Sequence, residues 1–178
     1  MPQPTGLPLP ARAVITSLIQ YYIDKVLILY PFLSETAIFA ALAEHQGTQC
    51  TPLAHWTVRM VAAISLASMS RKRGDQHYID AVGHAAEAFR SIEAVVQPGS
   101  MRGIQSLLLF VIYAMLDPHH FNSWYLIGIA SRVTVDLGLH QELPSDTQIP
   151  KPHLDFRRRV FHCIYSLDRY DMLTDIKT

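Results

Sequence analysis

Apolar side chains recur every three or four residues along most of this chain, which is the spacing of one face of an α-helix. No segment shows the alternation of β-branched residues that is typical of a strand. The pattern therefore predicts an all-α fold, an array of about seven helices. The predicted helices cover approximately residues 13–30, 35–46, 52–74, 76–97, 101–116, 122–137 and 154–172.

The boundaries of these helices carry residues that suit helix ends. Side-chain oxygens of Ser, Thr and Asp accept hydrogen bonds from the first free N–H groups of a helix, and proline is well tolerated at the first helical position. Gly138 stands where a left-handed residue would end the sixth helix, after which Leu139 is expected to fold back onto the last turn. The predicted N-caps are Ser34, Thr51, Asp75 and Ser100.

The first ten residues contain four prolines and a glycine, which a helix cannot accommodate. We predict a proline-rich linker over residues 1–12, one helical domain over residues 13–172 and a short tail over residues 173–178. A chain of 178 residues is long enough to bury a core of its own.

The amino-acid composition excludes several classes of protein function. Hydrophobic residues make up 49% of the chain and charged residues 17%, which is typical of a globular domain rather than a disordered one. Fifteen basic residues balance fifteen acidic ones, so we do not expect the chain itself to bind nucleic acid. Cys50 and Cys163 are too few and too far apart for a zinc cluster, and together with the lack of a signal peptide they predict an intracellular protein.

A membrane-associated protein built on the apolar helices at residues 13–30 and 104–116 is one alternative. The longest apolar run, residues 107–116, has about half the roughly 20 residues that a spanning helix needs. Asp24 and Lys25 interrupt the other helix. We therefore predict no membrane partner.

A small helical metal-binding protein or enzyme is the second alternative. Asp80, His84 and Glu87 share one helix face, a spacing that suits metal ligands. The same residues also suit a solvated polar edge opposite an apolar stripe containing Val82 and Phe89. No nucleophile motif or phosphate-binding loop accompanies them, so the sequence predicts no enzyme and no cofactor in this chain.

The last third of the chain places charge in unusual positions. Arg157–Arg159 fall in the first turn of the predicted last helix, where cations oppose the helix dipole. Asp168 shares a face with Phe161 and Tyr165, which turns its carboxylate toward the apolar side. We hypothesise that Arg132 or one of the three arginines pairs with Asp168, because an unpaired inward charge is costly. Solvation of each charge at the helix edge is the alternative.

The same region resembles the regulatory domain of fungal binuclear zinc-cluster transcription factors of the xylanolytic-activator type, also called the middle homology region. The similarity covers about residues 18–170. His162 departs from it, because the family usually has Trp there, and the family continues beyond the Asp-Arg pair into further helices. The resemblance therefore implies a domain that is incomplete at its C-terminus. The residues that carry it, called the motif residues below, are Gly128, Arg132, Leu137, Gly138, Leu139, His140, Arg157, Arg158, Arg159, Phe161, Tyr165, Asp168 and Arg169.

This resemblance implies a nuclear protein that regulates DNA-templated transcription without catalysis. In the family, DNA and zinc are bound by a six-cysteine cluster, which these 178 residues do not contain. The implied partners are other proteins, intramolecular domains or a small-molecule effector, with DNA reached only through the cluster. An incomplete helical array also implies exposed apolar surface, and hence partner dependence or aggregation.

Overall fold

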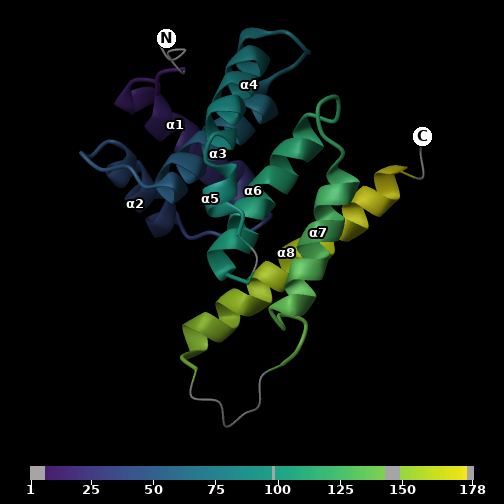
Figure 1. The fold of residues 1–178 in the computed structure, drawn as a ribbon. Helices are drawn as coiled ribbons and strands as arrows, with labels where there is room; N and C mark the ends of the chain where they lie inside the picture. The colour runs from purple at the N-terminus through teal and green to yellow at the C-terminus, as the bar shows by residue number, and fades with distance from the viewer. Residues whose placement is uncertain (1–6, 98, 143–148, 176–178) are drawn as a thin grey trace. The chain divides into compact units, whose positions relative to one another are not determined.

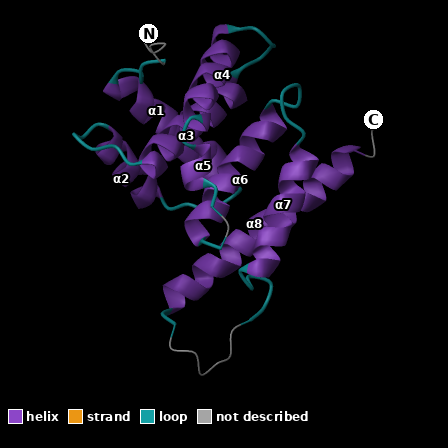
Figure 2. Cartoon of the chain, viewed as in Figure 1, coloured by secondary structure: helices purple, strands orange, loops and turns teal. Residues whose placement is uncertain are grey.

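The computed structural model describes residues 7–97, 99–142 and 149–175. Over these residues it contains eight α-helices, one π-helical segment and no strand, which confirms the predicted all-α fold (Figures 1 and 2). The chain divides into two compact units. The first comprises Met1–Leu29 and Leu33–Val95, and the second comprises Tyr30–Phe32 and Val96–Thr178.

The first unit is built around α3 (Pro52–Met69), which packs against each of the other α-helices of the unit (Figure 1). Arg59 is the only charged residue in α3, and the helix is buried on nearly all sides from Ala54 to Leu66. Ser65 Oγ donates a hydrogen bond to the Leu18 carbonyl at 2.8 Å, which joins α3 to α1. The surrounding elements are α1 (Arg12–Tyr22), the π-helical segment η1 (Ile23–Leu27), α2 (Glu35–His45), α4 (Gln76–Phe89) and α5 (Ile92–Val95).

All four predicted N-caps are confirmed. The side chains of Ser34, Thr51, Asp75 and Ser100 each accept a hydrogen bond from the backbone N–H three residues later, at 2.8 to 3.2 Å. Asp75 also accepts from the backbone N–H of Arg71 at 2.9 Å. These backbone donors lower the pKa of the Asp75 carboxyl to about 2.

Three predicted helices were too long. The first was expected to run to residue 30, but α1 ends at Tyr22 and continues only as η1. The third was expected to end near Gly74, but α3 ends at Met69, because Asp75 holds the backbone before it in a turn in which Gly74 has a φ of +86°. The fourth ends at Phe89 rather than near residue 97, where three-residue hydrogen bonds replace the helical ones before the short α5.

The buried face of α4 also differs from the predicted one. The apolar stripe was expected to include Val82, Ala85 and Phe89, of which Ala85 is buried but Val82 and Phe89 are only partly buried. The buried residues of α4 are Ala81, His84, Ala85 and Ala88. Three of these side chains are alanines, which let α4 lie close against α3. Phe89 still contacts α3, with its ring centre 5.9 Å from that of Trp56.

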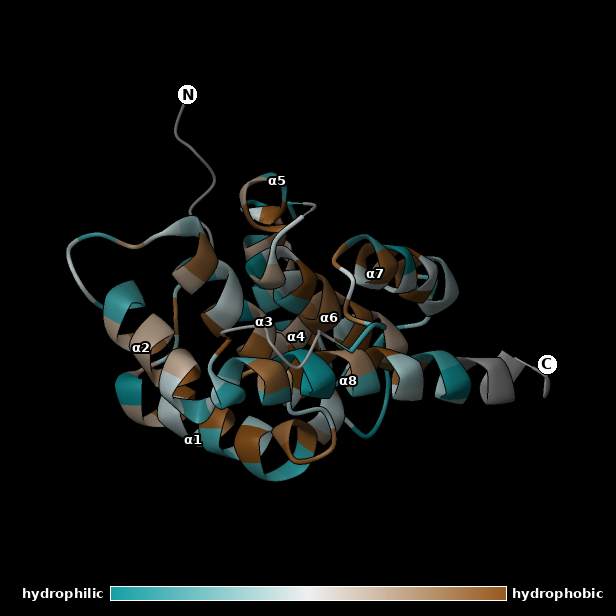
Figure 3. Ribbon diagram, turned by 90° about the horizontal axis from the view of Figure 1, so that it is seen from below, coloured by the Kyte–Doolittle hydropathy of each residue, from teal (hydrophilic) through white to brown (hydrophobic). Residues whose placement is uncertain are grey.

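The second unit contains α6 (Met101–Leu116), α7 (Ser123–Asp136) and α8 (Lys151–Asp175), with α7 packed against both of the others. α6 is the most apolar helix and supplies more of the buried side chains of this unit than any other helix (Figure 3). Gly103 has no room for a side chain, because an added Cβ would collide with the Gln97 carbonyl. Gln105 Nε2 donates to the Phe32 carbonyl at 2.7 Å, which fixes the short segment at residues 30–32 in this unit.

No helix in the described part of the chain is both long and apolar enough to span a lipid bilayer.

Candidate functional site

Part of the motif set comes together where α7 ends and α8 passes beside it, whereas Gly128, Arg132 and Asp168 line a separate hollow. Gly138 has a φ of +63°, a left-handed conformation that glycine adopts without steric cost. The Gly138 N–H donates to the Val135 carbonyl at 2.9 Å, and the Leu139 N–H donates to the Thr134 carbonyl at 3.0 Å. These two bonds form a Schellman motif, and Leu139 is buried. The predicted helix stop is confirmed.

The side chain of Arg157 binds the backbone at this helix end. Its Nη2 donates to the Gly138 carbonyl at 2.9 Å, across 19 positions of sequence. A cation at the C-terminus of α7 interacts favourably with the negative end of the helix dipole. The expectation that the arginines lie in the first turn of their own helix was wrong, because α8 begins at Lys151. Arg157 therefore stabilises the neighbouring helix and does not weaken its own first turn.

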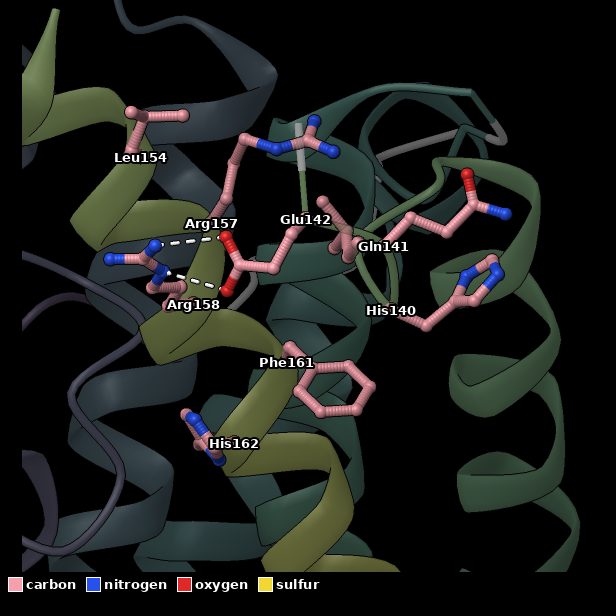
Figure 4. Close-up of a pocket in the computed structure, with 9 residues that line it drawn as sticks. His140, Gln141, Glu142, Leu154, Arg157, Arg158, Phe161 and His162 are labelled. Carbon is pink, nitrogen blue, oxygen red and sulfur yellow. Dashed lines mark hydrogen bonds and ion pairs between the residues drawn. The ribbon is translucent and has the colours of Figure 1, made fainter. Parts of the chain in front are cut away.

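Arg158 joins α8 to the segment that follows α7. Its Nε and Nη2 donate to the two carboxylate oxygens of Glu142, at 3.2 and 2.8 Å (Figure 4). Asp155, one turn earlier in α8, lies 3.8 Å from the same guanidinium. The hydrogen bond from Arg158 lowers the pKa of the Glu142 carboxyl. Both side chains are exposed, so this pair orients the segment more than it stabilises the fold.

Two further arginines of α8, Arg159 and Arg169, lie over aromatic rings. The Arg159 guanidinium lies 5.8 Å from the centre of the Phe156 ring, and that of Arg169 lies 5.2 Å from the centre of the Tyr165 ring. Phe161 and Tyr165 stack one turn apart, with ring centres separated by 6.5 Å. α8 thus carries two separate cation–ring contacts, and Phe161 stacks on the ring of the second.

The predicted ion pair to Asp168 is wrong for the described residues. Arg157 and Arg158 have the partners given above, and no ion pair joins Arg132 to Asp168. Arg132 is exposed and Asp168 is half-buried, although both line one surface hollow. The sequence could not show that a carbonyl and a carboxylate from the segment after α7 would lie closer to the arginines than Asp168 does.

Five motif residues line a small polar hollow of about 190 Å³. That volume is below the roughly 300 Å³ at which small-molecule sites usually begin. We therefore interpret the hollow as part of the packing between α7 and α8 and not as a ligand site. His162, which departs from the family pattern, is exposed and makes an edge contact with Phe161 at 5.6 Å between ring centres. The five motif residues are Leu139, His140, Arg157, Arg158 and Phe161.

The candidate metal ligands on α4 do not converge. His84 is buried and its Nδ1 lies 2.9 Å from Arg59 Nη1, while Glu87 pairs with Arg90 at 3.6 Å. Asp80 accepts a hydrogen bond from Gln76. Among the described side chains, no three His, Cys, Asp or Glu residues lie close enough to hold a metal ion. The geometry gives the metal alternative no support.

Sequence reasoning missed the buried Arg59. It is 6% exposed, and burial lowers its pKa. His45 and His55 stack beside it with ring centres 5.5 Å apart, and burial followed by the charge of Arg59 lowers the pKa of both. The signal that could have found it was a single charged residue inside an 18-residue helix with no other Lys, Arg, Asp or Glu.

Comparison with known proteins defines the class to which this fold and motif belong. Residues 19–174 match the fungal specific transcription factor domain. The chain therefore belongs to the family of fungal specific transcription factor domains. Its function, within that class, is that of a regulatory domain in transcription.

Curated relatives agree with this assignment. The pyrimidine pathway regulatory protein 1 of Saccharomyces cerevisiae is 38% identical over 111 residues, which are 51% of this chain and 12% of that protein. The positive regulator of purine utilization of Emericella nidulans is 30% identical over 124 residues, 53% of this chain and 12% of that protein. The fusaridione A cluster transcription factor of Fusarium heterosporum is 22% identical over 166 residues, 91% of this chain and 32% of that protein. The chain thus spans a third or less of these relatives, and no solved structure matches it significantly.

Proposed function

We propose that this chain is a regulatory portion of a fungal zinc-cluster transcription factor and that it acts in the nucleus through protein contacts. The observation that supports this most is the joint between α7 and α8. There, five of the motif residues line one hollow, and Arg157 donates a hydrogen bond to the carbonyl of Gly138 at the end of α7. A regulatory domain needs such rigid joints to transmit contacts made on one face to the rest of the factor.

In this proposal the chain does not contact DNA itself. It carries equal numbers of acidic and basic residues and only two cysteines, so zinc and DNA would be bound by a cluster outside these 178 residues. The chain would modulate the activity of the factor without catalysing a reaction. A gel-shift measurement with the isolated chain should show only weak, salt-sensitive binding to DNA of any sequence.

A reporter assay tests the regulatory role directly. The chain is inserted between a heterologous DNA-binding domain and an activation domain, and reporter output is compared with that of the same fusion without the chain. We expect the insertion to change the output. Arg157→Met, which keeps the aliphatic stem but removes the hydrogen bond to Gly138, should weaken this effect.

Arg102→Met is the matched control, because Arg102 is exposed on α6 and is not among the residues that line the hollow at the joint. It should leave the effect of the insertion intact. Equal reporter output with and without the chain, at equal protein levels, would contradict the proposed function.

A further inference from the structure

In the second unit, α7 exposes a row of apolar side chains on consecutive turns. Trp124 is 53% exposed, Tyr125 63% and Ile129 52%. Single exposed apolar residues are ordinary, but neighbouring large apolar side chains that are all more than half exposed on one helix indicate an interaction surface. Together with Gly128 and Arg132, these residues are called the α7 face.

The α7 face lines a hollow of about 510 Å³, to which α8 contributes Asp168. Its aromatic side chains are more than half exposed. Small-molecule sites usually enclose most of their ligand, and this hollow is too open to do so. A second protein surface is the occupant that would cover it.

Gly128 indicates how closely that surface approaches. It lies in the middle of α7, where glycine weakens a helix relative to alanine. A Cβ added there would meet no atom within 4 Å, so nothing inside the chain requires the missing side chain. A glycine at such a position lets the backbone of another helix come close.

The charges of the hollow indicate which protein approaches. Arg132 and Asp168 both line it, yet no ion pair joins them within the described chain. A surface with one cation and one anion, each without a partner of opposite charge, is complementary to itself under two-fold symmetry. The same rotation places apolar residues against apolar residues.

We propose that the α7 face binds the α7 face of a second copy of this chain. The two α7 helices cross at Gly128, and Arg132 of each copy lies opposite Asp168 of the partner subunit. This dimer is independent of any zinc cluster, because all the residues that form it belong to the 178 residues of this chain.

Sedimentation of the whole chain over a range of concentrations tests the proposal. Wild-type protein should show a reversible monomer–dimer equilibrium, and Gly128→Leu should raise its dissociation constant about a hundredfold by blocking the crossing point. Within one chain the leucine side chain meets open space, so the melting temperature of the monomeric variant should equal or exceed that of the wild-type monomer. A purely structural role for Gly128 predicts no change in the dissociation constant.

Charge reversal tests the orientation. Arg132→Asp and Asp168→Arg should each raise the dissociation constant about tenfold, and the double variant should restore dimerisation. Arg102→Asp on α6 changes the net charge by the same amount as Arg132→Asp and should have no effect. A chain that stays monomeric up to about 100 µM, or a dimer that neither Gly128→Leu nor charge reversal weakens, would overturn the proposal.

Discussion

The buried pair of Arg59 and His84 should make the first unit sensitive to mild acid. Arg59 Nη1 lies 2.9 Å from His84 Nδ1, and both side chains are less than one-tenth exposed. Because a guanidinium can only donate, the imidazole must accept at Nδ1 and is therefore neutral, with its proton on Nε2. Burial, and then the charge of Arg59, lower the pKa of His84 to about 4.

The size of the effect follows from linkage between proton binding and folding. In the unfolded chain, histidine has a pKa of about 6.5, so above that pH His84 is neutral in both states and costs nothing. Below it the unfolded chain binds a proton that the folded chain excludes, and stability falls as the pH falls toward about 4. Between pH 7.5 and 5.0 the loss from His84 alone is about 2 kcal/mol.

His45 and His55 should add to the loss in the same direction, because their pKa values are also lowered. The carboxyl groups with lowered pKa values titrate below this window, so the interval from pH 7.5 to 5.0 reports mainly on histidines. The contribution of His84 must therefore be isolated by substitution.

His84→Gln isolates it, because the glutamine oxygen can still accept from Arg59 but does not titrate. Urea unfolding is followed through Trp56 fluorescence in a Trp124→Phe background, which leaves a buried tryptophan of the first unit as the single reporter. Between pH 7.5 and 5.0, the histidine protein should lose about 2 kcal/mol more unfolding free energy than His84→Gln. His77→Gln, at an exposed position of the same helix, should behave like the parent.

An equal loss of stability in His84→Gln and the parent protein would refute this reasoning. It would mean that His84 accepts a proton in the folded state, and hence that the hydrogen bond from Arg59 does not hold the imidazole neutral.

Three further outcomes can be checked independently. Gly138→Val should cost about 2 kcal/mol in urea unfolding, because its φ of +63° strains a β-branched residue, whereas Gly138→Asn should cost less; equal costs would argue against the left-handed stop. Ser65→Ala should cost about 1 kcal/mol through loss of the buried bond to α1, whereas Ser17→Ala, which removes an exposed bond, should cost little; similar thermal shifts for both would contradict the difference in burial. A thiol reagent should modify the exposed Cys50 in the native protein but Cys163 only after unfolding. Burial keeps the reagent away from Cys163 and raises the pKa of its thiol to about 12. Rapid labelling of both thiols in the native protein would contradict this and show that α8 opens.

The helix boundaries show which structural features can be predicted from residues close together in the sequence. Four N-caps and the glycine stop of α7 were predictable, because each depends on side-chain oxygens or backbone freedom within a few residues of the helix end. The early ends of α1, α3 and α4 were not predictable, because a π-helical turn, the turn held by Asp75 and the start of α5 interrupt apolar patterns that by themselves favour longer helices.

In the candidate site, too, some features were predictable from the sequence and others were not. The motif residues could be named in advance, and the family match supports the class they indicate. Their partners could not be named, because the segment after α7 places the Gly138 carbonyl and Glu142 beside the arginines, while Asp168 stays half-buried and faces a hollow.

By itself, the sequence determined the all-α class, the main helix starts and the transcription-factor family, because periodicity, capping and short motifs are local properties. Only the tertiary structure decided which face of α4 is buried, that Arg59 is enclosed beside neutral histidines, and that Gly128 opens onto an uncovered surface. These features depend on how closely neighbouring helices approach, and that distance is a balance of packing, hydrogen bonding and desolvation over residues far apart in the chain.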